Sequence, residues 1–202
     1  MIELKQVSKE FQNKSVIKDM TLSIQHGDFV VFSGNSGCGK TTLLNMIGGL
    51  EKPTKGEILV DGVNIYKCKN LEKYFTYTIG FLFQNFALIE NKTVRQNLEM
   101  VQKKARSGLS VDEALTAVGI AGLSDVEVYK LSGGEQQRVA IARLMFKQCE
   151  IILADEPTGS LDPENTEIVM GYLHQLNAEG KTVILVTHNE KIINSEEKVI
   201  RL

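Results

Sequence analysis

The sequence predicts an α/β fold with a mostly parallel core sheet, an antiparallel β part near the N-terminus and a helical insert. Strand-like and helix-like segments alternate along most of the chain, and a glycine-rich turn joins a buried strand to a helix. Several helix-start signals cluster between residues 85 and 148. We therefore expect one domain over 1–202, with the core and the β part in 1–84 and 149–202 and a helical subdomain in 85–148.

The strands are predicted from short apolar runs and from the alternation of polar and apolar residues. MIELKQVSKEF alternates as a half-buried strand does, whereas FVVFS is continuously apolar, as a strand buried on both faces requires. Asp61-Gly62 is a hairpin turn signal between two such runs. The expected strands are, in order, 1–11, 20–24, 29–33, two runs within 56–65, 78–83, 150–155, 181–187 and 197–202.

The helices are predicted from capping residues and from apolar periodicity. Residues 41–50 predict a helix directly after the glycine-rich turn. Thr93, Ser110 and Ser132 each precede a Gln or Glu with the spacing of a capping box. Asp162, followed by a proline, suits the start of a further helix. The core face of that helix is expected to consist of Ile168, Val169, Tyr172, Leu173 and Leu176.

The composition excludes several classes of protein. The 202 residues are 43% hydrophobic and 24% charged, which is typical of a globular protein and not of a disordered or fibrous one. The net charge of -2 disfavours nucleic acid as a partner, and no apolar run is long enough to span a membrane. The 3 cysteines form no CxxC pair, so neither zinc nor a disulfide framework is expected, and a cytoplasmic location is favoured. Cys68 and Cys149 are expected to be structural.

GNSGCGKT at 34–41 has the pattern G-x-x-x-x-G-K-[ST] and lies between a predicted buried strand and a predicted helix. Glycines let several backbone N–H groups converge on a phosphate chain, and the positive end of the helix adds to the attraction. Lys40 can bridge the β- and γ-phosphates, and the Thr41 hydroxyl can ligate Mg²⁺. A purely structural glycine turn is the alternative. The residues expected to contact the nucleotide are Gly34, Asn35, Ser36, Gly37, Cys38, Gly39, Lys40, Thr41 and Thr42.

IILADE at 151–156 is a hydrophobic strand that ends in two acids. Asp155 and Glu156 would therefore lie at the carboxyl edge of the sheet, where open α/β folds bind their ligands. We expect Asp155 to hold Mg²⁺ and Glu156 to orient and deprotonate the attacking water. The alternative is a solvated strand end that carries no chemistry.

LSGGEQQR at 131–138 is the most specific motif. Ser132 would cap a helix that begins with Gly133 and Gly134, and Glu135 would complete the capping box. The exposed amides of such a helix start form a second anion site. One nucleotide cannot easily use two separated phosphate sites in one subunit. We therefore expect a head-to-tail dimer, in which these residues cap the γ-phosphate of ATP held by the partner. A plain capped helix is the alternative.

Together these motifs resemble those of the nucleotide-binding subunits of ATP-binding cassette (ABC) transporters. The resemblance covers essentially the whole chain, in the family's order: GNSGCGKT, FQN at 83–85, LSGGEQQR, ILADE, SLD at 160–162 and TH at 187–188. It implies a P-loop NTPase fold with a RecA-like core, ATP and Mg²⁺ as cofactors, an ATP-dependent homodimer, and ATP hydrolysis coupled to transport. It also implies a transmembrane permease subunit as partner, which would hold this chain at the cytoplasmic face of the membrane.

The resemblance implies roles for four further residues. Phe11 would stack on adenine, Gln84 would touch Mg²⁺ or the attacking water, and Asp162 would contact the phosphate loop of the opposite subunit. His188 would hydrogen-bond the γ-phosphate and hold the lytic geometry together with Glu156. Burial in the core is the alternative for Phe11, and a helix-capping role is the alternative for His188.

The segment 80–94 is rich in apolar side chains around Gln84. By resemblance it forms the groove that receives a cytoplasmic helix of the permease; the alternative is that all of it is core. The runs MIGGLEKPTKGEILVDG and LADEPTGSLD resemble a bacterial branch of lipoprotein-releasing, macrolide-export and bacteriocin-export ATPases. We therefore expect an exporter, with an antimicrobial peptide or a lipophilic molecule as cargo. A soluble superfamily member acting in DNA repair or translation is the alternative function, and a GTPase is disfavoured because the N-K-x-D motif is missing.

Overall fold

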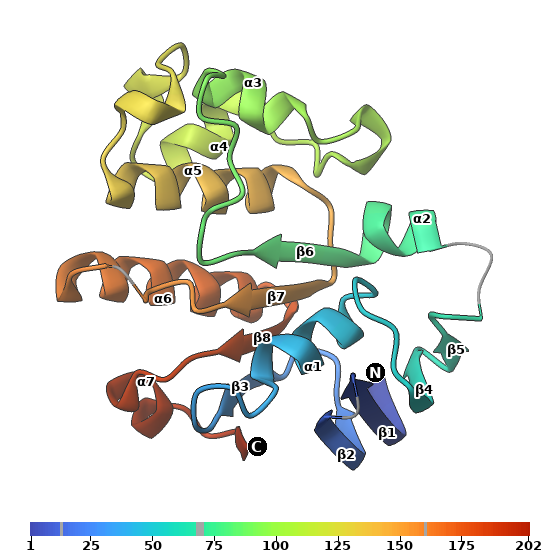
Figure 1. Ribbon diagram of the computed structural model, residues 1–202. Helices are drawn as coiled ribbons and strands as arrows, with labels where there is room; N and C mark the ends of the chain where they lie inside the picture. Colours follow the sequence, from blue (N-terminus) through green and yellow to red (C-terminus); the bar gives the residue numbers. More distant parts are fainter. Residues whose placement is uncertain (13, 68–70, 160) are drawn as a thin grey trace.

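The computed structural model describes residues 1–12, 14–67, 71–159 and 161–202, which form two sheets with helices packed around them (Figure 1). The α/β class is confirmed: a parallel sheet forms the centre, and an antiparallel sheet lies beside it. Cys68, for which we predict a structural role, and Ser160 of the SLD motif lie outside the described residues.

The antiparallel sheet has 4 strands in the order β2-β1-β4-β5. In its longest pair, β1 with β2, Ile2 pairs with Ile24 and Phe11 pairs with Lys14. The predicted hairpin between β4 and β5 turns at Asp61-Gly62, whose φ values of 50° and 75° suit such a tight turn. The strands are Ile2–Phe11 (β1), Lys14–Ile24 (β2), Lys55–Val60 (β4) and Val63–Asn64 (β5).

The central sheet has 5 strands in the order β6-β7-β8-β3-β9, and its neighbouring strands are parallel. Successive residues of β7 face opposite sides: Ile151 and Leu153 belong to one core cluster, and Ile152 and Ala154 to the other. Both faces are covered, which explains why these strands are continuously apolar. The strands are Phe29–Ser33 (β3), Ile79–Leu82 (β6), Ile151–Asp155 (β7), Thr182–Val186 (β8) and Val199–Arg201 (β9).

Helices cover both faces of the central sheet (Figure 1). Helix α1 packs on β7 and β8 from the side of the antiparallel sheet, whereas α5 packs on β6, and α6 on β8, from the opposite side. The carboxyl ends of β3, β7 and β8 meet at one edge, where the chain leaves each strand into a loop. The helices are Lys40–Ile47 (α1), Gly133–Phe146 (α5), Pro163–Ala178 (α6) and Glu190–Ser195 (α7).

The chain between β6 and β7 is helical, and its three α-helices begin at the predicted capping boxes of Thr93, Ser110 and Ser132. Helices α3, α4 and α5 pack on one another. The division into a core and a helical subdomain at 85–148 stays a prediction. The remaining elements are α3 (Val94–Glu99), α4 (Val111–Ala117) and the 3₁₀ turns Lys103–Ala105, Ala121–Leu123 and Val128–Lys130.

Three local features differ from the sequence-based expectation. Strand β2 begins at Lys14, well before the predicted strand at 20–24. A short helix, α2 (Leu71–Lys73), continues into a π-helical turn (Tyr74–Thr78) directly before β6, where we predict no helix. On α6, Met170 is buried with the core face, whereas Ile168 and Tyr172 are only half-buried, because α6 packs against both α5 and β8. Across the described part of the chain, no helix combines the length and the apolar character of a membrane span.

Candidate functional site

The glycine-rich turn after β3 is shaped by backbone geometry that favours glycine. Gly34, Gly37 and Gly39 have φ values of 142°, 78° and 105°, which L side chains rarely adopt. Space is restricted as well, because a Cβ at Gly39 would lie 2.8 Å from a side-chain carbon of Val16. These glycines are therefore required for the turn to reach the first residue of α1 in this conformation.

Lys40 is the first residue of α1 and is 8% exposed. Its ammonium group donates hydrogen bonds to the carbonyl oxygens of Gly34 at 2.7 Å and Asn35 at 3.0 Å, and Cys38 Sγ lies 3.9 Å away. These neutral groups hold the positive charge inside the turn without cancelling it. The turn therefore combines a fixed cation with backbone N–H groups at a helix start, which is the arrangement that binds phosphate chains.

Thr41 joins the phosphate loop to the end of β7, since its hydroxyl donates to Asp155 Oδ1 at 3.0 Å. Burial raises the pKa of Asp155 above the ordinary aspartate value; the hydrogen bond from Thr41 opposes this shift, and the charge of Glu156 adds to it. A half-buried carboxylate beside a hydroxyl is the kind of oxygen pair that Mg²⁺ prefers.

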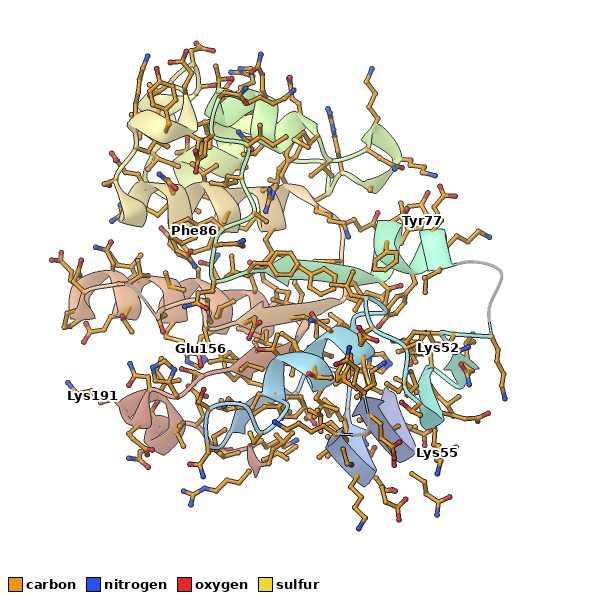
Figure 2. All side chains as sticks on the ribbon, in the orientation of Figure 1. Lys52, Lys55, Tyr77, Phe86, Glu156 and Lys191 are labelled. Atoms are coloured by element: carbon orange, nitrogen blue, oxygen red, sulfur yellow. The ribbon has the colours of Figure 1, made fainter. Side chains whose placement is uncertain are left out.

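Glu156 follows β7 with a φ of 46°, in the left-handed region that costs a non-glycine residue about 1–2 kcal/mol. Its carboxylate Oε1 lies 2.8 Å from His188 Nδ1, at the edge of the central sheet where Figure 2 labels Glu156. Backbone strain of this kind is typical of functional sites. The helix-capping alternative for His188 is wrong, because Asn189 caps α7.

Most residues predicted to contact ATP line one cavity of 460 Å³, which we name the phosphate-loop cavity. Phe11 enters it from the end of β1 and is 43% exposed, so the alternative that Phe11 is a core residue is wrong. The Lys9 ammonium lies 4.6 Å from the centre of the Phe11 ring. The lining residues are Phe11, Val16, Ser36, Gly37, Gly39, Lys40, Thr41, Thr42, Gln84, Glu156, Val186 and His188.

The remaining residues predicted on this side lie directly beside the phosphate-loop cavity. Gly34 and Asn35 line an adjoining cavity of 520 Å³, which His188 also lines. Cys38 and Asp155 contact lining residues through their own side chains. The structure thus brings the predicted phosphate-loop and carboxylate residues together, although they come from distant parts of the chain.

Ser132, Gly133 and Gly134 form the start of α5. Ser132 Oγ accepts a hydrogen bond from the Glu135 N–H at 3.3 Å and donates to its carboxylate at 2.7 Å. A Cβ at Gly133 would meet nothing within 4 Å, whereas a Cβ at Gly134 would lie 2.9 Å from Asn165 Oδ1. Neither glycine has a positive φ. The fold of this chain therefore explains a glycine at 134 but not at 133.

These three residues line a different cavity, of 690 Å³, which we name the signature cavity. Asp162 also lines it and caps α6 as predicted, because its Oδ1 accepts from the Asn165 N–H at 2.9 Å. Among the described residues, none lines both the signature cavity and the phosphate-loop cavity. Within one chain, the structure does not bring together the two groups of residues predicted to hold one nucleotide.

Sequence reasoning missed several residues around the two cavities. Val16 and Val186 line the phosphate-loop cavity, and Lys9 lies over the aromatic ring that enters it. Arg138 and Asn165 line the signature cavity. Arg138 stands inside the LSGGEQQR motif, which was the one available signal. The others carry no local signal, because strand pairing and helix packing bring them to the cavities.

A small cavity of 200 Å³, which we name the β6 groove, lies where β6 meets the helical segment. Phe81 and Phe83 stack there with ring centres 5.1 Å apart and remain partly exposed, so the alternative that 80–94 is all core is wrong. Arg143 and Lys147 donate hydrogen bonds to backbone carbonyls at the groove. The lining residues are Phe75, Ile79, Phe81, Phe83, Val101, Arg143, Leu144 and Lys147.

Known proteins are similar to this chain in sequence and in fold. Residues 17–159 match the ABC transporter family. The chain is 38% identical to YvrO of Bacillus subtilis, an uncharacterised ABC transporter ATP-binding protein, over 99% of this chain and 92% of YvrO. It is also 38% identical to the macrolide export ATP-binding/permease protein MacB of Campylobacter jejuni, over 100% of this chain but only 33% of MacB.

Solved structures agree with these relatives. The dimeric structure of MJ0796, a bacterial ABC transporter cassette, matches with a TM-score of 0.88 at 39% identity, over 100% of this chain and 94% of that one. A dimeric post-hydrolysis state of MJ0796 bound to ADP and Pi matches with a TM-score of 0.88 at 38% identity, over the same shares of the two chains, 100% and 94%. The chain therefore belongs to the ABC transporter family, as an ATPase cassette.

Proposed function

We propose that this chain is the ATP-hydrolysing subunit of a bacterial membrane exporter and works as a homodimer that closes on two ATP molecules. The separation of the two cavities carries the proposal, because neither holds all the groups that a γ-phosphate site needs. A head-to-tail dimer would set the signature cavity of one subunit against the phosphate-loop cavity of its partner. The dimeric structures of MJ0796 support the formation of a dimer.

ATP binds in the phosphate-loop cavity of each subunit. The Lys40 ammonium and the N–H groups of the glycine-rich turn bind the phosphates, and the Phe11 ring offers a face for adenine. Lys9, itself paired with Glu51 at 2.5 Å, helps to fix the orientation of that ring.

Hydrolysis breaks the bond between the γ-phosphorus and the oxygen that bridges it to the β-phosphate. Glu156 orients the attacking water and takes its proton, a contribution of about 10²- to 10⁴-fold for a well-placed general base. His188 Nδ1 lies 2.8 Å from the Glu156 carboxylate, and its Nε2 would bond the γ-phosphate. The products are ADP and phosphate, and the Ser132, Gly133 and Gly134 turn of the opposite subunit stabilises the γ-phosphate charge.

Mg²⁺ would be held by Thr41 and Asp155, with Gln84 reaching either the ion or the attacking water. The contact between Thr41 and Asp155 fits this role, since it places two hard oxygen donors 3.0 Å apart beside the phosphate loop. No cluster of three or more His, Cys, Asp or Glu side chains occurs among the described residues, so phosphate and water oxygens would complete the shell. The ion would neutralise charge that develops on the phosphates.

The β6 groove is the surface that we assign to the permease. Its partly exposed aromatic rings offer an apolar contact, and the cations of Arg143 and Lys147 beside them are held by backbone carbonyls. A permease bound there would hold the chain at the cytoplasmic face of the membrane. The macrolide-export relative supports an exporter, and relatives named as transporter proteins disfavour the alternative of a soluble role in DNA repair or translation.

The decisive test uses Glu156→Gln, which removes the base but keeps the shape of the side chain. We expect ATP binding to be kept, turnover to fall by about 10²- to 10⁴-fold, and a stable dimer to form in saturating ATP. Size-exclusion chromatography with and without ATP measures the dimer. A monomer at saturating nucleotide would contradict the proposed closure.

Ser132→Arg tests whether the signature cavity acts on the partner's nucleotide. The long cation should obstruct the signature cavity while leaving the phosphate-loop cavity of the same chain unaltered, because the two share no residue among those described. We expect unchanged ATP affinity and lost turnover. A loss of ATP affinity in the isolated subunit would argue against a site shared between subunits.

A further inference from the structure

Asn165, in the first turn of α6, contacts the two helix starts that line the signature cavity, that of α6 and that of α5. Its N–H and its Nδ2 donate to the two carboxylate oxygens of Asp162, at 2.9 Å and 2.6 Å. Its Oδ1 accepts from Arg138 Nη2 at 3.3 Å and would lie 2.9 Å from a Cβ at Gly134. One amide group thus touches the cap of α6, the signature helix α5 and a signature glycine.

The orientation of this amide is fixed by chemistry. Only its oxygen can accept from a guanidinium group, and only its nitrogen can donate to a carboxylate. Within the described chain, the bond to Asn165 is the one side-chain hydrogen bond of Arg138, whose buried Nε has no partner. Arg138 therefore depends on Asn165 for its orientation, and the amide cannot rotate without losing both partners.

The amide also fixes the Asp162 carboxylate. Hydrogen bonds from the Asn165 N–H and side chain hold the pKa of Asp162 below the ordinary aspartate value, which shows that they stabilise its carboxylate form. Asp162 itself is exposed, as is Gly133 on the facing helix. Arg138 and Asn165 are both half-buried. Their hydrogen bond forms a polar link between helix α5, which carries Gly133, and the Asp162 cap of α6.

We infer that Asn165 is a positioning residue, which holds the Gly133-Gly134 turn and the Asp162 carboxylate in one arrangement for the nucleotide of the opposite subunit. The inference rests on the proposed function, because it assigns Asn165 to the site completed across the dimer. Surfaces that are fixed in advance lose less conformational freedom when they close on a ligand. Without the link, closure and turnover weaken, whereas the chain's own phosphate loop still binds ATP.

Asn165→Ala removes both hydrogen bonds of the amide and leaves the backbone cap of α6 in place. We expect turnover at saturating ATP to fall about tenfold, with the ATP dissociation constant of the isolated subunit changed by no more than about twofold. In the Glu156→Gln background, the ATP concentration that gives half-maximal dimer should rise by a similar factor of about ten. The midpoint temperature of unfolding of the isolated subunit should fall by only a few degrees, which is roughly the effect of losing one pair of hydrogen bonds.

Two further variants separate positioning from general stability. Asn165→Ser keeps a hydroxyl that can donate to Asp162 and accept from Arg138, so it should recover a large part of the turnover. Gln175→Ala removes another amide from α6, one that bonds Glu179 at 3.3 Å and lines neither cavity. It should leave turnover and dimer formation unchanged.

Each outcome bears on the inference. Unchanged turnover and dimer formation in Asn165→Ala would overturn it. A parallel loss of ATP affinity and thermal stability would overturn it too, because this result assigns Asn165 a structural role. If Glu156→Gln with Asn165 intact stays monomeric in ATP, the proposed dimer itself fails and the inference fails with it. Glu156→Gln alone therefore tests the dimer, and Glu156→Gln combined with Asn165→Ala tests the role of Asn165.

Discussion

The phosphate-loop cavity and the signature cavity are built in opposite ways. In the first, Lys40 bonds the backbone carbonyls of its own turn, and the Thr41 hydroxyl donates to Asp155. In the second, Ser132 forms a closed cap with its own helix, and the neighbouring Gly133 faces open space. Each glycine of the first surface has a reason within the chain, whereas the second surface includes Gly133, whose Cβ position meets nothing of its own chain.

The glycines of the two cavities also differ in whether the fold of this chain explains them. Those of the phosphate loop are explained by left-handed φ values and close contacts, and Gly134 is explained by the Asn165 amide. Gly133 has neither a left-handed φ nor a close contact in its own chain. We therefore attribute the need for a glycine at this position to a group that approaches from another molecule. Variants that alter one cavity at a time test this difference between the two cavities.

Lys40→Ala should have the largest effect, because it removes the fixed positive charge of the phosphate loop. Charge-assisted hydrogen bonds to phosphate are strong, so we expect ATP affinity to fall about 100-fold. We also expect the rate of hydrolysis to fall to the background rate. Calorimetric titration and phosphate release measure the two effects. Lys191→Ala, at an exposed lysine of α7 (Figure 2), is the matched control. Near-normal hydrolysis in Lys40→Ala would contradict the role of the loop.

Gly133→Ala should lower turnover about tenfold without lowering ATP affinity or stability, because its new methyl group meets nothing in its own chain. Gly171→Ala is the control: Gly171 lies in α6, its Cβ position is also open, and its turnover should be unchanged. Phosphate release and thermal unfolding of both variants decide the question. Full activity in Gly133→Ala would indicate that nothing approaches this glycine.

Alkylation of Cys38 should block nucleotide binding, because Cys38 stands in the phosphate loop with its Sγ 3.9 Å from Lys40 Nζ. Bound ATP should slow the reaction several-fold by covering the loop. Mass spectrometry with and without ATP measures the modification, and Cys149, which is 3% exposed, serves as a buried internal control. Complete alkylation in saturating ATP, with hydrolysis unchanged, would contradict this expectation.

Asp155→Asn should change stability by a small amount that depends on pH. Burial raises the pKa of Asp155 in the folded chain above its unfolded value, so stability is full below the unfolded value and is lost as the pH rises through the raised one. The variant should therefore unfold about 2–4 °C above the wild type at neutral pH and show no difference in acid, where the aspartate is protonated. Hydrolysis should be lost. A constant difference across the pH range would show that ionisation is not the cause.

Local signals predicted those features that depend on residues close together in the chain. The capping boxes at Thr93, Ser110 and Ser132, the Asp162 cap and the Asp61-Gly62 turn are all present in the structure. Each is formed within four residues, so sequence spacing alone determines its geometry.

Contacts between distant segments were beyond such reasoning. Sequence left Phe11 open between a core residue and an adenine contact, and only strand pairing shows it exposed in a cavity. The π-helical turn before β6 and the Asn165 link were not anticipated, because packing between elements decides both.

The sequence was sufficient to predict the α/β class, the approximate positions of most strands and the glycine-rich turn between a buried strand and a helix. These depend on periodicity, capping and turn chemistry, which act over a few positions. The sequence predicted a second anion site separate from the phosphate loop, but the residues that line each of the two cavities became visible only in the folded chain. The lining of each cavity depends on how the sheet edge and the helix starts are oriented in space, and no local spacing encodes that relation.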